Sequence, residues 1–146
     1  MRVRDGVEAD ARALASMTGR PEGVVRDMIH DRSVRVAVTD GAASAADADA
    51  GDDTPVDAVR GFVAFDVRDG VVHVTNVEGD PDAVGRLFEE PVGFATREGM
   101  TVEAVLPPDG TAADAAESVG FEAVGSGPRI DGASTTRYRF DPDGSD

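Results

Sequence analysis

The chain has 146 residues, which is about the length of a single domain. It contains no cysteine, so disulfides and thiolate metal sites are excluded, and it contains no apolar run long enough to cross a membrane as a helix. Its net charge is −15, from 29 acidic residues and 14 basic residues that are all arginine, and this balance disfavours a nucleic-acid-binding surface.

The first part of the chain predicts a strand, two helices and a second strand. Asp10 stands where the N-cap of the first helix is expected, and Pro21 suits the first turn of the second helix. Apolar residues recur at helical spacing in both helices and alternate with polar residues in the second strand. The predicted ranges are Met1–Arg4, Ala11–Met17, Pro21–His30 and Ser33–Thr39.

Residues 40–58 consist largely of alanine, aspartate and glycine. Such a segment has almost nothing to bury, so it predicts a low-complexity acidic surface loop that joins two strands. A hairpin is predicted next, with strands Arg60–Val67 and Val71–Val77 and an Asp69-Gly70 turn.

A long helix is predicted over Ala83–Glu98, with Val84, Leu87 and Phe88 on its inner face. Gly85 is expected to allow close packing. Pro91 is expected to kink or split this helix near its middle, because an interior proline costs roughly 3 kcal/mol.

The remaining elements are a strand, a short helix and two final strands, with a frayed tail over residues 141–146. Their predicted ranges are Thr101–Leu106, Thr111–Ser118, Phe121–Val124 and Thr135–Phe140. The order predicts one α/β domain over residues 1–140, in which helices flank a mixed, mostly antiparallel central sheet.

This order of elements resembles that of the GNAT superfamily of acyl-CoA-dependent N-acyltransferases. The opening Met1–Met17 is similar to the family's first strand and helix, and Val77–Leu87 stands in the place of its pyrophosphate-binding segment, with Gly85 at a family glycine. Thr101–Leu106 and Val119-Gly120-Phe121 match its last strand-helix unit. The resemblance implies acetyl-CoA as cofactor and a small-molecule or protein amine as partner.

The resemblance also implies site residues. The cofactor would contact the backbone of Asn76 and Val77 and the amides of Ala83, Val84 and Gly85, with Arg86 as a compensating cation. Glu78 stands where a general base could deprotonate the amine, and Tyr138 is a candidate acid. The alternative, purely structural interpretations are that Glu78 is a surface carboxylate and that Tyr138 is a half-buried strand aromatic. No metal site is expected, since two isolated histidines do not make one.

Three positions depart from the family pattern. Asp82 replaces the usual glutamine or arginine, Leu87 replaces the second glycine, and Ala116 replaces the tyrosine that many members use as acid. These departures leave an alternative open, in which a GNAT-like domain has lost catalysis and serves as a binding or interaction module.

The surplus of aspartate and the lack of lysine resemble cytoplasmic proteins of salt-in halophilic archaea. In molar salt the Debye length falls to about 3 Å, which screens the self-repulsion of so many carboxylates. A hydrophobic share of 40% argues for a packed core rather than a disordered acidic chain. The N-terminus is too polar for a signal peptide, so a cytoplasmic protein is expected, without binding to nucleic acid or membrane, as a monomer or homodimer.

Overall fold

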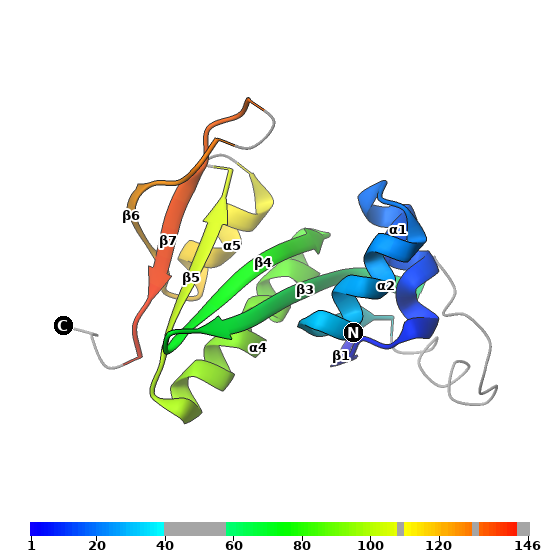
Figure 1. Ribbon diagram of the computed structural model, residues 1–146. Helices are drawn as coiled ribbons and strands as arrows, with labels where there is room; N and C mark the ends of the chain where they lie inside the picture. The colour runs from blue at the N-terminus through cyan, green and yellow to red at the C-terminus, as the bar shows by residue number, and fades with distance from the viewer. Residues whose placement is uncertain (40–57, 108–109, 130–131, 143–146) are drawn as a thin grey trace.

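The computed structural model describes residues 1–39, 58–107, 110–129 and 132–142, and it confirms the predicted order of strands and helices (Figure 1). The strands are β1 (Arg2–Asp5), β2 (Ser33–Val38), β3 (Val59–Arg68), β4 (Val71–Gly79), β5 (Thr101–Leu106), β6 (Glu122–Ser126) and β7 (Thr136–Phe140). The helices are α1 (Ala11–Thr18), α2 (Glu22–Asp31), α4 (Pro81–Glu98) and α5 (Thr111–Ser118), with a 3-10 turn η1 (Glu8–Asp10) before α1. Nearly all of the predicted 40–58 loop, and the tail from residue 143 on, lie outside the described residues.

The strands form one seven-stranded sheet in the order β1-β2-β3-β4-β5-β7-β6. Every neighbouring pair is antiparallel except β4 and β5, which are parallel. The prediction of a mixed, mostly antiparallel sheet is therefore confirmed. The parallel pair follows from chain connectivity, because α4 carries the chain from the end of β4 back to the start of β5.

Helices cover both faces of the sheet (Figure 1). On one face, α1 and α2 bury Leu14, Val25 and Met28 against alternate residues of β2 and β3, including Val36 and Phe62. On the other face, α4 and α5 pack against the remaining inward residues of β3, β4, β5 and β7. The alternation of strand side chains thus divides the core into two clusters, one on each side of the sheet.

Helix α4 begins earlier than predicted and runs without a break through Pro91. Its buried face includes Val84, Leu87, Phe88 and Pro91 itself, and all but the proline belong to the core cluster on this side of the sheet. Packing of both halves of α4 against one sheet keeps the helix continuous although Pro91 lacks an N–H donor. The helix is therefore not split.

Asp10 occupies the N-cap position of α1, as predicted, but its side chain makes no hydrogen bond to the first turn of that helix. Its carboxylate is 0% exposed and accepts hydrogen bonds from both terminal nitrogens of Arg4, at 2.9 and 2.8 Å, and from the Val7 N–H at 2.8 Å. This bidentate ion pair ties the end of β1 to the start of α1. The buried Asp10 carboxylate is stabilised by its hydrogen bonds to Arg4 and to the Val7 N–H, and not by a hydrogen bond to the first turn of α1.

Candidate functional site

The central irregularity of the sheet is a β-bulge at Thr75. Ala64 of β3 pairs with Asn76 of β4, but the next residue, Phe65, pairs with Val74, so Thr75 is an extra residue in β4. The Thr75 hydroxyl donates to the Ala64 carbonyl at 3.2 Å. A bulge bends its strand and shifts the alternation of side chains by one residue.

The bulge changes which face the end of β4 presents. Asn76 lies opposite Ala64 and Glu78 lies opposite Phe62, and both partners belong to the cluster under α1 and α2. Since directly opposed residues of an antiparallel pair point to the same face, Asn76 and Glu78 point towards α1 and α2. If Thr75 held an ordinary position in the ladder, Asn76 and Glu78 would share the face of Val74, which packs towards α4 and α5.

The bulge also marks the point where β4 leaves β5. The two strands pair from Val71 with Thr101 to Val74 with Ala104, and no further pairing joins them although both strands continue. Figure 1 shows them diverging from a common end. Because backbone polar groups of a strand alternate between its two sides, some N–H and C=O groups of β4 after Val74 face this opening without a strand partner.

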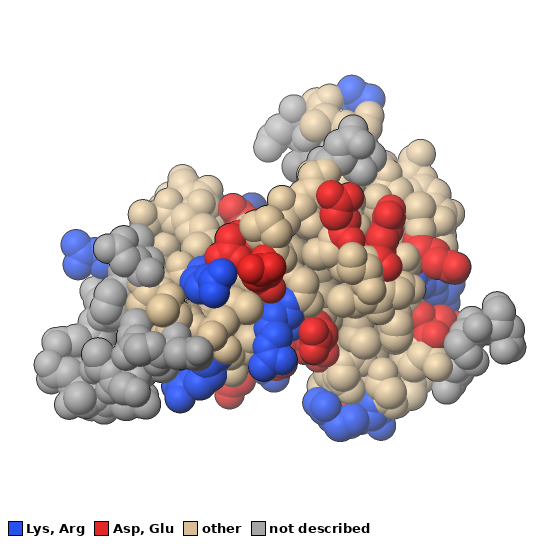
Figure 2. Space-filling model, turned by 180° about the vertical axis from the view of Figure 1, so that it is seen from behind, with Lys and Arg blue, Asp and Glu red and all other residues tan. Residues whose placement is uncertain are grey.

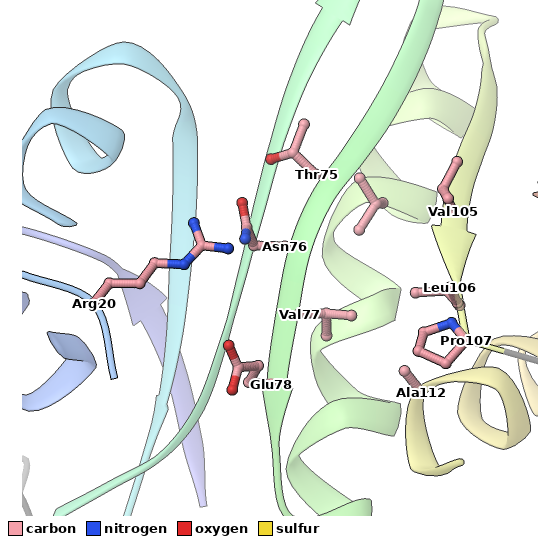
Figure 3. A pocket seen from close by; sticks show the side chains of 10 residues that line it. Arg20, Thr75, Asn76, Val77, Glu78, Val105, Leu106, Pro107 and Ala112 are labelled. Carbon is pink, nitrogen blue, oxygen red and sulfur yellow. The ribbon is translucent and has the colours of Figure 1, made fainter. Parts of the chain in front are cut away.

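A cavity of about 350 Å³ occupies the opening between the two strands (Figure 3). Asn76, Glu78 and Arg20 line it from the side of α1 and α2, whereas Val77 points towards Leu106 on β5. Pro107 and Ala112 of α5 close that second side. The cavity therefore reaches from one face of the sheet to the other. An extended, narrow ligand could pass between β4 and β5 through such a cavity.

Glu78 is the only carboxylate that lines this cavity among the described residues. Burial raises the pKa of Glu78 above its ordinary value, and the nearby Arg20 guanidinium opposes that rise. A carboxylate whose pKa is raised towards neutrality is better matched to proton abstraction than an ordinary surface glutamate. The structure thus brings three of the predicted residues, Asn76, Val77 and Glu78, to one cavity.

Tyr138 does not lie at this cavity. It is 3% exposed, pairs with Ala104 and Ala123 in the sheet, and packs in the core beneath α4 and α5. Its hydroxyl is therefore not placed to donate a proton to a ligand between β4 and β5, and Tyr138 is a strand aromatic that is fully buried rather than half-buried. Ala116 is fully buried as well, so this part of the chain presents no side-chain acid to the cavity.

The first turn of α4 already holds a carboxylate. Asp80 is the N-cap, and its side chain accepts from the Ala83 N–H at 2.9 Å, while the Val84 N–H donates to the Asp80 carbonyl at 2.9 Å. Arg60 of β3 donates two hydrogen bonds to the same carboxylate, from Nε at 2.9 Å and from a terminal nitrogen at 3.2 Å. Desolvation opposes the effect, but these hydrogen bonds and the charge of Arg60 lower the pKa of Asp80 overall.

Two of the three amides predicted to meet a phosphate therefore have partners within the chain. Arg86, the predicted compensating cation, is exposed and lies 3.8 Å from Glu89, one turn further along α4. Figure 2 shows acidic side chains spread over the face of the molecule that is turned away from the viewer in Figure 1. A phosphate at this helix end would have to displace or share the amide that Asp80 occupies.

A second cavity, of about 270 Å³, lies between the start of α4 and α5 and is lined by Pro81, Gly85, Thr111, Asp114, Ala115 and Ser118. Gly85 does not serve close packing, because a Cβ added there would have no atom within 4 Å. The prediction about its packing is wrong. The glycine instead leaves open space on the surface that faces α5.

Gly85→Ala is expected to stabilise the protein by about 0.5–1 kcal/mol, since alanine has the higher helix propensity and meets no steric obstacle. Urea denaturation of the ligand-free protein measures the change. Gly93→Ala, at a second glycine of α4 with only the Arg97 side chain nearby, is the matched control and should give a similar gain. A loss of stability confined to Gly85→Ala would show that the glycine is required for packing after all.

The described ranges contain no group of three or more histidine, aspartate or glutamate side chains that could hold a metal ion. None of the helices that the structure describes is long and apolar enough to span a membrane.

The solved structures most informative for this chain are acetyltransferases of one fold. Its structure is similar to that of the ribosomal-protein-S18-alanine N-acetyltransferase from Escherichia coli, with a TM-score of 0.67 and 16% identity over 96% of this chain and 92% of that one. PaiA N-acetyltransferase from Thermoplasma acidophilum, solved in complex with coenzyme A, gives a TM-score of 0.63 at 11% identity over 96% and 98% of the two chains. A GNAT-family acetyltransferase from Bacillus cereus gives 0.63 at 10% identity over 96% of each chain.

No family model matches the sequence, and no curated protein does. The likeness therefore lies in the arrangement of strands and helices. At these identities it shows a common fold.

Proposed function

From the GNAT fold of the chain, we propose that it is an acyl-CoA-dependent N-acyltransferase that transfers an acetyl group from acetyl-CoA to an amine. The observation that carries this proposal is the opening between β4 and β5, with its 350 Å³ cavity and the bulge at Thr75 that creates it. Fold alone does not assign an activity, whereas a cavity with unpaired strand backbone and a half-buried carboxylate supports one.

The cavity suits the thioester end of the cofactor. Backbone groups of Asn76 and Val77 would pair with its amides and acyl carbonyl as a substitute for the missing strand neighbour. Val77, Leu106 and Pro107 would contact its apolar stem. The second cavity, beside Gly85, would receive a more distant part of the same molecule.

The phosphate end fits less well. Asp80 occupies the Ala83 N–H, and Asp82 is an exposed carboxylate in the first turn of α4. The helix dipole favours an anion there by about 0.3–1 kcal/mol, but a carboxylate about 4 Å from a phosphate costs on the order of 1 kcal/mol in water. The amides of Ala83, Val84 and Gly85, together with Arg86, would therefore contribute little affinity in dilute salt.

Acyl-CoA would supply an activated thioester, so that transfer forms an N–C amide bond, breaks the thioester C–S bond and releases CoA as a thiolate, which takes a proton from the solvent. The residues of the chain have two tasks in this proposal. Glu78 accepts the proton that the amine loses, because it is the carboxylate at the cavity and burial raises its pKa. The β4 backbone holds the acyl group in reach of that amine.

Thermal melting in molar KCl, with and without millimolar acetyl-CoA, tests the cofactor assignment. A ligand that binds the folded protein raises its melting temperature in proportion to the logarithm of ligand concentration over Kd. The proposal expects an upward shift with acetyl-CoA and none with acetate. The absence of any shift at millimolar acetyl-CoA would exclude the cofactor assignment.

Asp82→Gln is expected to tighten acetyl-CoA binding about fivefold in dilute salt, because it removes roughly 1 kcal/mol of repulsion towards a phosphate. Titration calorimetry at low and at molar salt measures this change, which should shrink as salt screens the charge. Glu98→Gln makes the same charge change at the opposite end of α4 and should leave the affinity unchanged. Equal effects of both variants would mean that net charge, and not a phosphate near Asp82, governs binding.

A second candidate function follows from Asp80. A helix end that is capped by its own carboxylate, beside Asp82, is the arrangement expected of a GNAT-like module that has lost its cofactor and binds another partner. The same titration separates the two candidates. Binding that appears only in Asp82→Gln would favour the module, whereas turnover of any amine by the unmodified protein would exclude it.

A further inference from the structure

Arg20 projects into the cavity from the loop between α1 and α2. The loop is anchored at the end of α1, where Gly19 takes a left-handed conformation with φ 74° and the Thr18 hydroxyl donates to the Leu14 carbonyl at 2.9 Å. The Arg20 N–H donates to the same hydroxyl at 3.2 Å. Figure 3 shows the Arg20 side chain pointing towards Asn76 and Glu78. The backbone that carries Arg20 is therefore fixed beside the cavity.

The charge of Arg20 is available to a ligand. Arg35 and Arg60, like most arginines of this acidic chain, lie within 4.0 Å of a carboxylate. In the part of the chain that the structure describes, the Arg20 guanidinium has no carboxylate within that distance, although its charge lowers the pKa of Glu78. Arg97 and Arg139 share this lack of a carboxylate partner among the described residues, but Arg20 also lines the cavity, where a ligand can reach its charge.

We propose that Arg20 binds a carboxylate of the acceptor while Glu78 faces its amine, so that the acceptor is a small amino acid rather than a polyamine. This inference rests on the proposed function and names its substrate class. Both side chains lie on the α1 and α2 side of the cavity, and the backbone proposed to hold the acyl group lies between them and β5. The transfer itself is unchanged: the amine nitrogen forms the new N–C bond, the C–S bond breaks with its electron pair on sulfur, the amine proton passes to Glu78, and CoA leaves as the thiolate.

Charge and size both favour this class. A guanidinium pairs with a carboxylate through two parallel hydrogen bonds, which also orients the molecule. A second ammonium group of a polyamine would meet the same cation at close range, and this repulsion would disfavour polyamines by about fivefold or more. A cavity of about 350 Å³ lies near the lower end of ligand pockets, which span about 300–1,000 Å³, so little room remains beside the thioester.

Release of the CoA thiol from acetyl-CoA, followed with three acceptors, tests the assignment. The acceptors are the free amino acids, their carboxamides, which keep the amine but lose the negative charge, and spermidine. Each is tested at about pH 8, above the ordinary range of a glutamate pKa. The variant is Arg20→Gln, and the matched control is Arg97→Gln, an exposed arginine in the last turn of α4. Ratios between variants cancel differences in amine pKa between acceptors.

The expected result is that the unmodified protein uses amino acids in preference to carboxamides and spermidine. Arg20→Gln should lower kcat/KM for amino acids about 10- to 100-fold, mainly through KM, and leave carboxamides within about twofold. Arg97→Gln should change neither. Equal losses for amino acids and carboxamides would overturn the assignment, as would a preference for spermidine.

Two further outcomes are separable. If Arg20→Gln instead abolishes a preference for succinyl-CoA over acetyl-CoA, Arg20 binds the acyl group and the acceptor assignment is overturned. If acetyl-CoA neither raises the melting temperature nor loses its thiol with any acceptor, the proposed function fails and this inference with it. If acetyl-CoA binds and amino acids and their carboxamides are acetylated equally well, the proposed function stands and only the role of Arg20 in binding the acceptor is overturned.

Discussion

Glu78→Gln is expected to lower kcat about 100- to 10,000-fold, the range that a positioned general base contributes, without weakening acetyl-CoA binding. Glutamine keeps the shape of the side chain but cannot accept the amine proton. The measurement combines thiol release with calorimetric titration of acetyl-CoA. Glu117→Gln removes the same charge from an exposed position on α5 and should retain full activity.

The pH profile gives a second readout for Glu78. Burial raises its pKa, with Arg20 opposing, so the carboxylate becomes protonated at a higher pH than an ordinary glutamate does. The acid limb of kcat/KM should therefore fall as pH decreases through this raised pKa, and Glu78→Gln should lack that limb. An unchanged rate or an unchanged profile in Glu78→Gln would remove Glu78 from the mechanism.

Loss of activity in Glu78→Gln should not come from unfolding. Because the pKa of Glu78 is higher in the folded than in the unfolded state, its ionisation disfavours the folded state, and stability falls as pH rises through that pKa. At neutral pH a neutral glutamine avoids this cost. The variant should therefore melt at the same or a slightly higher temperature than the unmodified protein.

Arg4→Ala is expected to destabilise the protein by about 3–5 kcal/mol, because it leaves the fully buried Asp10 carboxylate without its bidentate partner. Folded domains are stable by about 5–15 kcal/mol in total, so this is a large share. The melting temperature should fall on the order of 10 °C, which differential scanning calorimetry measures.

The double variant Arg4→Met/Asp10→Leu is the matched control for the ion pair. Replacing both members by apolar side chains of similar size removes the charge and its partner together, so it should recover most of the lost stability. A double variant as unstable as Arg4→Ala would show that shape or the Val7 hydrogen bond, rather than an uncompensated charge, accounts for the loss. Arg26→Ala, whose partner Glu22 is exposed, should cost less than about 1 kcal/mol.

Sequence periodicity was sufficient for the strands and helices of the second half of the chain. Thr101–Leu106 and Thr111–Ser118 match β5 and α5 residue for residue. Local alternation and helical spacing determine these elements, because each buries one face against a single core. The start of α4 was missed by two residues, since Asp80 and not a later residue caps the helix.

The bulge at Thr75 was not predicted, although the sequence carries a signal for it. Val72 and Val74 are two residues apart, whereas the next valine, Val77, is three residues on. A shift in the apolar period of a strand is what an extra residue produces. Recognising it would have placed Asn76 and Glu78 on the face of α1 and α2.

Arg20 and Asp80 were missed for a different reason. Their roles depend on long-range neighbours: the α1–α2 loop meets the end of β4, and Arg60 of β3 meets the N-cap of α4. Spacing along the chain carries no information about these contacts. Tyr138 was a candidate because it is the only tyrosine, and the pairing of β7 between β5 and β6 buries it.

An amide NMR titration of isotope-labelled protein with acetyl-CoA tests most directly whether the opening between β4 and β5 is the acyl-donor site. The expected result is saturable shifts at Asn76, Val77 and Leu106 and beside Gly85, with the exposed strand β6 unaffected. Shifts confined to surfaces away from this opening, or no saturable shift at all, would contradict the assignment.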